Sequence, residues 1–269
     1  MARNHRDEAI VALIDRDLAR AADDYTRAAY GTLAGVECEG DGRDLLGENA
    51  RWAGFALSYL LLAGACYRAN GENDRAAARC RAGIAVARDL QSAVLADPLD
   101  RACCAEFVGD FRVVGDVDSA IDAGTDTDGD NEMDAERNAA AYEEAADAYE
   151  AATAKADDPL SWASEPMASG AYRGPHQIAR NGSHSFEWDE MHGSDPDSLA
   201  YLARRPRFKR SRLPAAVEGI VETGYVHPPR GTTEHNNATW RCPNCERSEV
   251  NWIAGETICL DCSVRMEEQ

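Results

Sequence analysis

Four cysteines near the end of the chain have the spacing of a metal site. They form two pairs, Cys242-Pro-Asn-Cys245 and Cys259-Leu-Asp-Cys262, with thirteen residues between the pairs. Each Cys-x-x-Cys turn can present both sulfur atoms to one ion, and two such turns complete a tetrahedral site of four thiolates. The same spacing also allows a redox-active dithiol pair or two disulfides. We expect one structural zinc ion, because four sulfur ligands leave no coordination position for water or substrate.

The residues between the two cysteine pairs predict a β-hairpin. Glu249–Ile253 reads as one strand, Ala254-Gly255 as the turn and Glu256–Ile258 as the returning strand. A module of this size cannot fold on its apolar core alone. The bound metal is therefore expected to supply the folding free energy.

The sequence around the second cysteine pair resembles that of a known zinc ribbon. The sequence from Gly255 to Val264, Gly-Glu-Thr-Ile-Cys-Leu-Asp-Cys-Ser-Val, is similar to the end of the transcription-factor-B-type ribbon. That resemblance implies zinc at the four cysteines and, in the family, docking on RNA polymerase. Ser263 replaces the family's usual glycine, the ribbon is C-terminal rather than N-terminal, and nothing resembles the cyclin-like repeats. As a whole the chain resembles haloarchaeal proteins that carry such a ribbon.

A basic strip precedes the ribbon. Six bases and no acid occur within nine residues around Phe208: Arg204, Arg205, Arg207, Lys209, Arg210 and Arg212. One interpretation is a phosphate-backbone contact with Phe208 stacking on a base. The alternative, which we favour, is intramolecular: the strip lies against an acidic helical domain, since arginine forms good bidentate pairs with carboxylates.

Two further constellations suggest metal sites but fit them poorly. The acidic run Asp126–Asp134 resembles a calcium loop, yet Asn131 and Arg137 stand where an EF-hand needs glycine and glutamate. We expect a solvated acidic loop there. The histidines of the middle segment and two nearby glutamates have no spacing typical of a metal motif, so we expect surface side chains. They are His176, His184, His192, Glu187 and Glu190.

Motifs for catalysis are absent from the sequence. There is no Gly-Lys-Ser/Thr phosphate loop, no Gly-x-Ser-x-Gly elbow and no Gly-x-Gly-x-x-Gly turn. No catalytic residue can be named, and we expect a non-enzymatic protein.

The elements that must position these groups are mainly helical. Apolar periodicity predicts one helix through Ile14 to Ala28, closed near Glu39, and further helices over 45–69, 73–93, 99–113, 116–123 and 132–156. Five cysteines outside the ribbon are expected to be small core residues. They are Cys38, Cys66, Cys80, Cys103 and Cys104.

One stretch resembles a tetratricopeptide repeat. The family's small, aromatic and turn positions are matched by Leu60, Ala63-Gly64, Tyr67, Gly71, Ala76, Cys80 and Gly83. The resemblance covers about 34 residues. It implies a TPR-like helical array, while a plain helical bundle fits the other helices equally well.

Charge indicates the setting of the protein. The net charge is −20, from 48 acids and 28 bases, and Lys155 and Lys209 are the only lysines. Such a surface repels itself unless concentrated salt screens it, so the composition is typical of a salt-accumulating halophilic archaeon. No signal peptide or membrane span is evident, since the longest uncharged run is the sixteen residues Trp52–Tyr67. We expect a cytoplasmic location and no membrane partner.

Proline and charge both divide the chain near residue 159, and nine of its ten prolines lie from there onward. We therefore predict a mainly α fold: a helical domain over 1–158, an irregular middle segment over 159–237 and a small β zinc ribbon over 238–269. The expected function is a zinc-binding adaptor whose helices bind a protein partner. The alternative is a transcription-associated or nucleic-acid-binding protein that uses the ribbon and the basic strip.

Overall fold

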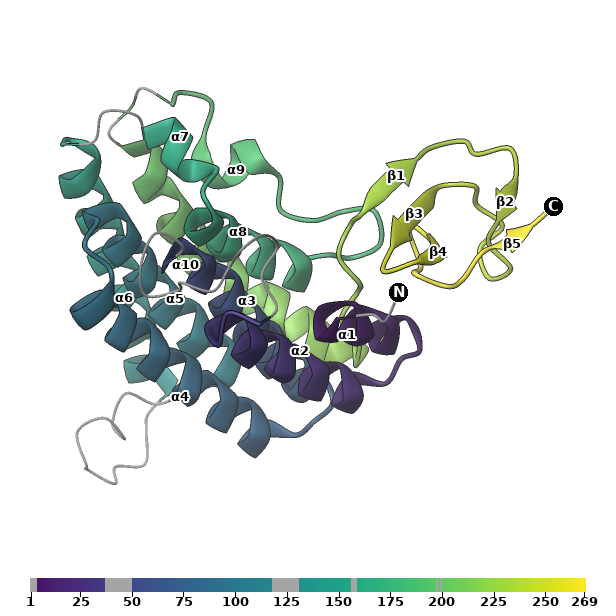
Figure 1. The fold of residues 1–269 in the computed structure, drawn as a ribbon, viewed down its shortest axis with the longest axis horizontal. Helices are drawn as coiled ribbons and strands as arrows, with labels where there is room; N and C mark the ends of the chain where they lie inside the picture. The colour runs from purple at the N-terminus through teal and green to yellow at the C-terminus, as the bar shows by residue number, and fades with distance from the viewer. Residues whose placement is uncertain (1–3, 37–49, 118–130, 156–158, 197, 199) are drawn as a thin grey trace.

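The computed structural model describes residues 4–36, 50–117, 131–155, 159–196, 198 and 200–269. A body of packed helices is followed by a small β module at the C-terminus, which confirms the mainly α fold with a β ribbon. Figure 1 shows the β module at one end of the body, next to the first helix.

The first helical pattern divides into two helices. α1 covers His5–Ile14 and α2 covers Leu18–Leu33, so the prediction of one continuous helix is wrong. Between them Arg16 takes a left-handed conformation with φ of 64°. The Asp17 side chain then accepts a hydrogen bond from the Arg20 backbone N–H, which starts a new helix.

The stretch that resembles a tetratricopeptide repeat forms a helical hairpin. α3 covers Ala53–Ala69, after the short 3-10 turn η1 at Ala50–Trp52, and α4 covers Asn73–Asp89. Gly71 makes the turn with φ of +77°. Gly64 lets the helices approach, because a Cβ there would lie 2.6 Å from the Cys80 sulfur. A π turn, η2 at Leu90–Val94, then ends α4.

Two long helices complete the predicted helical part. α5 covers Pro98–Gly115, with proline in its first turn and the Asp97 side chain capping it, and α6 covers Asn131–Thr153. The helix predicted over 116–123 falls mostly outside the described residues, as does the acidic calcium-like loop before α6.

The middle segment is helical, and its prediction as irregular is wrong. It forms α7 at Pro159–Ala163, α8 at Pro166–Ile178, α9 at Trp188–His192 and α10 at Ala200–Thr223. Proline takes the first position of α7 and α8, where it has no hydrogen bond to lose. α10 contains Pro206 and Pro214 in its interior. Its buried face and its ion pairs to α5 and α6 offset their cost of about 3 kcal/mol each.

The C-terminal module consists of two small antiparallel sheets. One has the order β1 (Thr232–Glu234), β3 (Val250–Ile253) and β4 (Glu256–Cys259), and the other pairs β2 (Trp240–Arg241) with β5 (Glu267–Glu268). Val250 pairs with Cys259 and Ile253 with Glu256, which confirms the predicted hairpin. β1 lies before residue 238, so the sheet takes in residues that the sequence assigned to the middle segment.

The core of the helical body is built largely from alanine, leucine and aromatic side chains. Cys66, Cys80, Cys103 and Cys104 are all buried in it, as predicted, while Cys38 falls outside the described residues. In the described part of the chain, no helix combines the length and the hydropathy that crossing a bilayer requires.

Candidate metal centre

Both cysteine pairs sit in turns with the same backbone pattern. The Glu246 N–H donates to the Cys242 carbonyl at 2.9 Å, and the Ser263 N–H donates to the Cys259 carbonyl at 3.0 Å. The residue after each pair is left-handed, with φ of 59° at Glu246 and 58° at Ser263. The sequence therefore folds twice into one local shape, and that shape directs two sulfur atoms to the same side.

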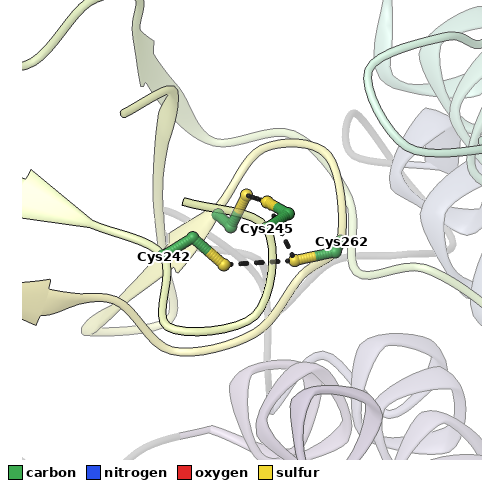
Figure 2. Close-up of side chains that lie close together, drawn as sticks. Cys242, Cys245 and Cys262 are labelled. Carbon is green, nitrogen blue, oxygen red and sulfur yellow. Dashed lines mark hydrogen bonds between the residues drawn. The ribbon is translucent and has the colours of Figure 1, made fainter. Parts of the chain in front are cut away.

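The four sulfur atoms meet between the turns. They all lie within 4.8 Å of one another, and Figure 2 shows Cys242, Cys245 and Cys262 directed toward a common centre. Sulfur pairs lie 3.3 Å apart for Cys242–Cys262, 3.5 Å for Cys245–Cys259 and 3.7 Å for Cys245–Cys262. A tetrahedral ion with bonds near 2.3 Å needs sulfur separations of about 3.8 Å, so the cage fits it closely.

The pKa values of the thiols shift in different directions, and burial raises that of Cys259. Burial raises the pKa of Cys242, while the backbone N–H groups of Cys245 and Asn244 act to lower it. Burial acts to raise the pKa of Cys262 too, but hydrogen bonds, first from the Val264 backbone, bring it below its usual range. N–H groups directed at sulfur stabilise the thiolate form that binds a metal. The four cysteines are free thiols, so the two-disulfide alternative is not adopted.

The serine that departs from the ribbon family's glycine links the ribbon to the body. Ser263 is fully buried, and its hydroxyl lies 3.0 Å from Nδ1 of His227, in the segment between α10 and β1. A left-handed conformation costs a non-glycine residue roughly 1–2 kcal/mol. The hydrogen bond to His227 offsets part of that cost.

The ribbon is fastened to the turn between α1 and α2. Ile10 and Ile14 of α1 pack on Ile258 of β4, and all three are buried. The left-handed Arg16 donates from Nη2 to the carbonyl of the cysteine ligand Cys262 at 3.1 Å. Its guanidinium also lies 3.3 Å from the centre of the Tyr225 ring. The break in the first helix thus places Arg16 against the metal site.

A second arginine joins body and ribbon from inside. Arg180, just after α8, is buried and donates to the carbonyl oxygens of Pro228 and Leu260. Leu260 follows the ligand Cys259 directly. Sequence reasoning missed both Arg16 and Arg180, because single arginines outside a motif carry no signal for a contact 80 or 246 residues away.

The basic strip lies on α10, and its side chains are largely paired with carboxylates. Arg205 holds Glu106 of α5 through two hydrogen bonds of 2.7 Å. Lys209 lies 2.7 Å from Glu106 and 2.6 Å from Asp110. All four of these side chains are fully buried.

Tyrosines of α6 complete the buried network. The Tyr149 hydroxyl donates to Glu106 at 2.8 Å, and the Tyr142 hydroxyl donates to Asp110 at 2.9 Å. Burial acts to raise the pKa of Glu106, but the charges of Arg205 and Lys209 bring it below its usual range. Burial raises the pKa of Asp110. The two carboxylates of the network therefore neutralise Arg205 and Lys209, the two buried bases of the strip.

The outer part of the strip reaches the acidic face of α6. Arg207 lies 2.6 Å from Glu150, and both Arg207 and Arg210 pair with Glu143. Phe208 meets Phe186 edge to face, with ring centres 4.9 Å apart. Arg204 and Arg212 are exposed and have no carboxylate partner among the described residues.

The middle-segment histidines do not gather into a metal site. Among the described residues, the four cysteines are the only cluster with metal-ligand geometry. His192 is buried and stacks on Trp188, while His176 is half-buried and lies 2.9 Å from the Ser185 hydroxyl. The prediction of surface side chains is thus wrong for these two, because the segment is packed helix. His184 is exposed as predicted.

Comparisons with known proteins give no match: no protein-family model, no curated protein and no solved structure is similar enough to the chain to be matched. The evidence for function therefore rests on the geometry of this chain.

Proposed function

We propose that this protein is a non-enzymatic adaptor in which a structural zinc ion folds the C-terminal ribbon and the helical body binds a protein partner. The observation that carries the proposal is the closed cage of four sulfur atoms from Cys242, Cys245, Cys259 and Cys262. A thiolate cage of this size favours zinc, and it leaves no open position for catalysis.

The contacts of the ribbon support a structural role for the metal. The ligand residue Cys262, its neighbour Ser263 and the adjacent Leu260 each bond to the helical body or to the segment leading from it. Folding of the ribbon therefore fixes a composite surface made of ribbon and helices.

The alternative of nucleic-acid binding has less support. Five side chains in and around the strip already form ion pairs or a ring contact within the protein: Arg205, Arg207, Phe208, Lys209 and Arg210. Within the described part of the strip, only Arg204 and Arg212 lack a carboxylate partner and could contact a phosphate backbone.

Metal analysis tests the zinc assignment. Native protein should contain one zinc ion per chain, and Cys259→Ser with Cys262→Ser should contain none. The matched control is Cys66→Ser with Cys80→Ser, two buried thiols outside the cage, which should keep its zinc if it folds. Native protein without zinc, or zinc retained by the ribbon variant, contradicts the assignment.

Partner capture in molar salt tests the adaptor role. Wild-type protein should retain a defined protein from lysate and should not retain DNA or RNA. The Cys259→Ser, Cys262→Ser variant should lose contacts that involve the ribbon. Retention of nucleic acid that Arg204→Gln with Arg212→Gln abolishes would instead establish the nucleic-acid function.

A further inference from the structure

A second site lies away from the cysteines, where α1, α3, α8 and the segment before β1 meet. A pocket of about 280 Å³ is lined there by Arg6, Arg173 and Arg230, and by the half-buried rings of Phe55, Tyr59 and Tyr172. A smaller hollow of about 110 Å³ shares Arg6, Phe55, Tyr59 and Arg173 with it.

Positive charge gathers in this pocket although the chain carries a net charge of −20. Within the described residues, no carboxylate lines the pocket, and Arg173 and Arg230 have no carboxylate partner. Arg6 pairs with its neighbour Asp7 at 3.0 Å. Nε of Arg230 is buried and has no hydrogen-bond partner in the described part of the chain. A buried donor without a partner carries a free-energy cost that a ligand acceptor would remove.

Burial and the charge of Arg230 lower the pKa values of two neighbouring groups. Burial, together with the charges of Arg230 and Arg180, lowers the pKa of His176 to about 4. Burial and the charge of Arg230 likewise lower the pKa of Arg180 to about 10. Burial is the largest cause of both shifts, and the charge of Arg230 adds to each.

The aromatic side chains that line the pocket favour a ligand that carries a planar ring beside its anionic group. Phe55 and Tyr59 come from α3, and Tyr172 comes from α8. The guanidinium of Arg173 already lies 5.2 Å from the centre of the Phe55 ring. Planar rings stack on such side chains, whereas guanidinium groups match the oxygens of phosphate.

The ribbon holds the critical arginine in place. Asn251 of β3 is fully buried, accepts a hydrogen bond from the Gly231 N–H at 2.7 Å and donates to the Pro229 carbonyl at 3.1 Å. One side chain of the metal-bearing hairpin thus clamps the backbone on both sides of Arg230. The geometry of the pocket depends on a folded ribbon.

We propose that this pocket binds a small phosphorylated ligand with a planar ring, of the size and chemistry of a mononucleotide. The arginines hold the phosphate, the aromatic side chains contact the ring, and the ribbon positions Arg230. The site is separate from the cysteine cage and from the adaptor role, and it rests on the proposed function only in requiring the folded ribbon.

Isothermal titration calorimetry tests the proposal on the full-length, zinc-loaded chain, in salt that preserves its helical circular dichroism. The probes are the four ribonucleoside 5′-monophosphates. Inorganic phosphate and adenosine are tested separately, as the phosphate part and the nucleoside part of such a ligand. At least one nucleotide should bind tenfold more tightly than either half. Arg173→Gln and Arg230→Gln should each weaken that binding at least tenfold, and Arg212→Gln, exposed and outside the pocket, should leave it unchanged.

Arg173 is exposed, so its variant is expected to fold even if Arg230→Gln does not. Asn251→Ala should also weaken binding, because it releases the clamp on the Arg230 backbone. No nucleotide binding at millimolar concentration, binding no tighter than that of phosphate, or binding unaffected by Arg173→Gln would each overturn the proposal. None of these results would alter zinc content or partner capture, so the proposed function stands or falls separately.

Discussion

At the scale of single residues, Lys209 is a lysine in a chain whose bases are nearly all arginine. Its ammonium group contacts Glu106 and Asp110 at once and is fully buried between α5 and α10. A compact ammonium can donate to two separate carboxylates, whereas a planar guanidinium requires more room. The chain has one other lysine, Lys155.

Removing this ammonium should be costly. Lys209→Met leaves Asp110 buried without a cation, and breaking a buried pair in this way costs about 3–5 kcal/mol. Adding Asp110→Asn should recover much of the loss, because the amide still accepts from Tyr142 and carries no charge. Urea unfolding of both variants measures the effect. A Lys209→Met variant as stable as wild type would show that the network contributes little.

His192 should make the protein sensitive to acid. Burial and the nearby Arg205 charge lower its pKa to about 3, against about 6.5 for an exposed imidazole. The unfolded chain therefore binds a proton that the folded chain does not. This contribution to stability is fully present above pH 6.5 and is lost as the pH falls toward 3.

The prediction is that the free energy of unfolding changes with pH at different slopes in wild type and in His192→Asn. Between about pH 6 and 4 the free energy of unfolding of wild type should fall more steeply than that of His192→Asn, by at most about 1.4 kcal/mol per pH unit. The exposed His184→Asn serves as the control. Equal slopes for wild type and His192→Asn would mean that folding does not lower the pKa of His192.

At the scale of elements, α10 has two faces that bind acidic helices with different strength. Its inner face carries Arg205 and Lys209 into the core, while Arg207 and Arg210 pair with α6 at the surface, with 38% and 47% of their side chains exposed. Water competes for the outer pairs, so they contribute less.

The outer pairs should therefore be dispensable. Arg207→Gln with Arg210→Gln should lower the free energy of unfolding by less than about 2 kcal/mol, since exposed pairs contribute about 0.2–1 kcal/mol each. Chemical unfolding measured beside Lys209→Met compares the two faces directly. If Arg207→Gln with Arg210→Gln lowered the free energy of unfolding as much as Lys209→Met or more, the weaker contribution of the outer face would be contradicted.

The break between α1 and α2 shows how a short irregularity positions a site. Asp15 pairs with Arg265 of the ribbon at 2.6 Å, and Arg16 bonds to the Cys262 carbonyl. A continuous helix through these residues would give Arg16 a helical backbone conformation. The capping side chain of Asp17 therefore has a consequence for the metal site as well as for α2.

At the scale of the whole molecule, the excess of acids over bases is expected to make stability depend on salt. Residues 1–160 hold 33 acids and 16 bases, and many of the arginines already form ion pairs. The remaining acids repel one another unless salt screens them, with a screening length of about 3 Å at 1 M and about 10 Å at 0.1 M.

Lowering the salt should unfold the helical body. Circular dichroism of the zinc-loaded chain should show loss of helical signal between molar and millimolar KCl, because the unscreened carboxylates destabilise the compact state. A chloride-matched series with a divalent cation serves as a control for specific ion binding. A helical signal independent of salt would contradict the halophilic interpretation.

The sequence by itself determined the features whose parts lie close together in the chain. The ligands of the cysteine cage stand in pairs with two residues between their members, and the hairpin between the pairs is closed by Ala254-Gly255. Local spacing sets the geometry of a turn, so the cage, the hairpin and the hairpin of α3 and α4 were predictable. Regular apolar periodicity predicted most of the other helices before residue 159 for the same reason.

Tertiary structure alone decided the features whose partners lie far apart. Arg205 and Glu106 are separated by 99 residues, and Arg16 and Cys262 by 246. Proline content favoured an irregular middle segment, but burial against α5 and α6 supplies the free energy that makes α10 a helix. The cationic pocket has no sequence signature at all. Its arginines come from α1, α8 and the segment before β1, and only the packing of these elements brings them together.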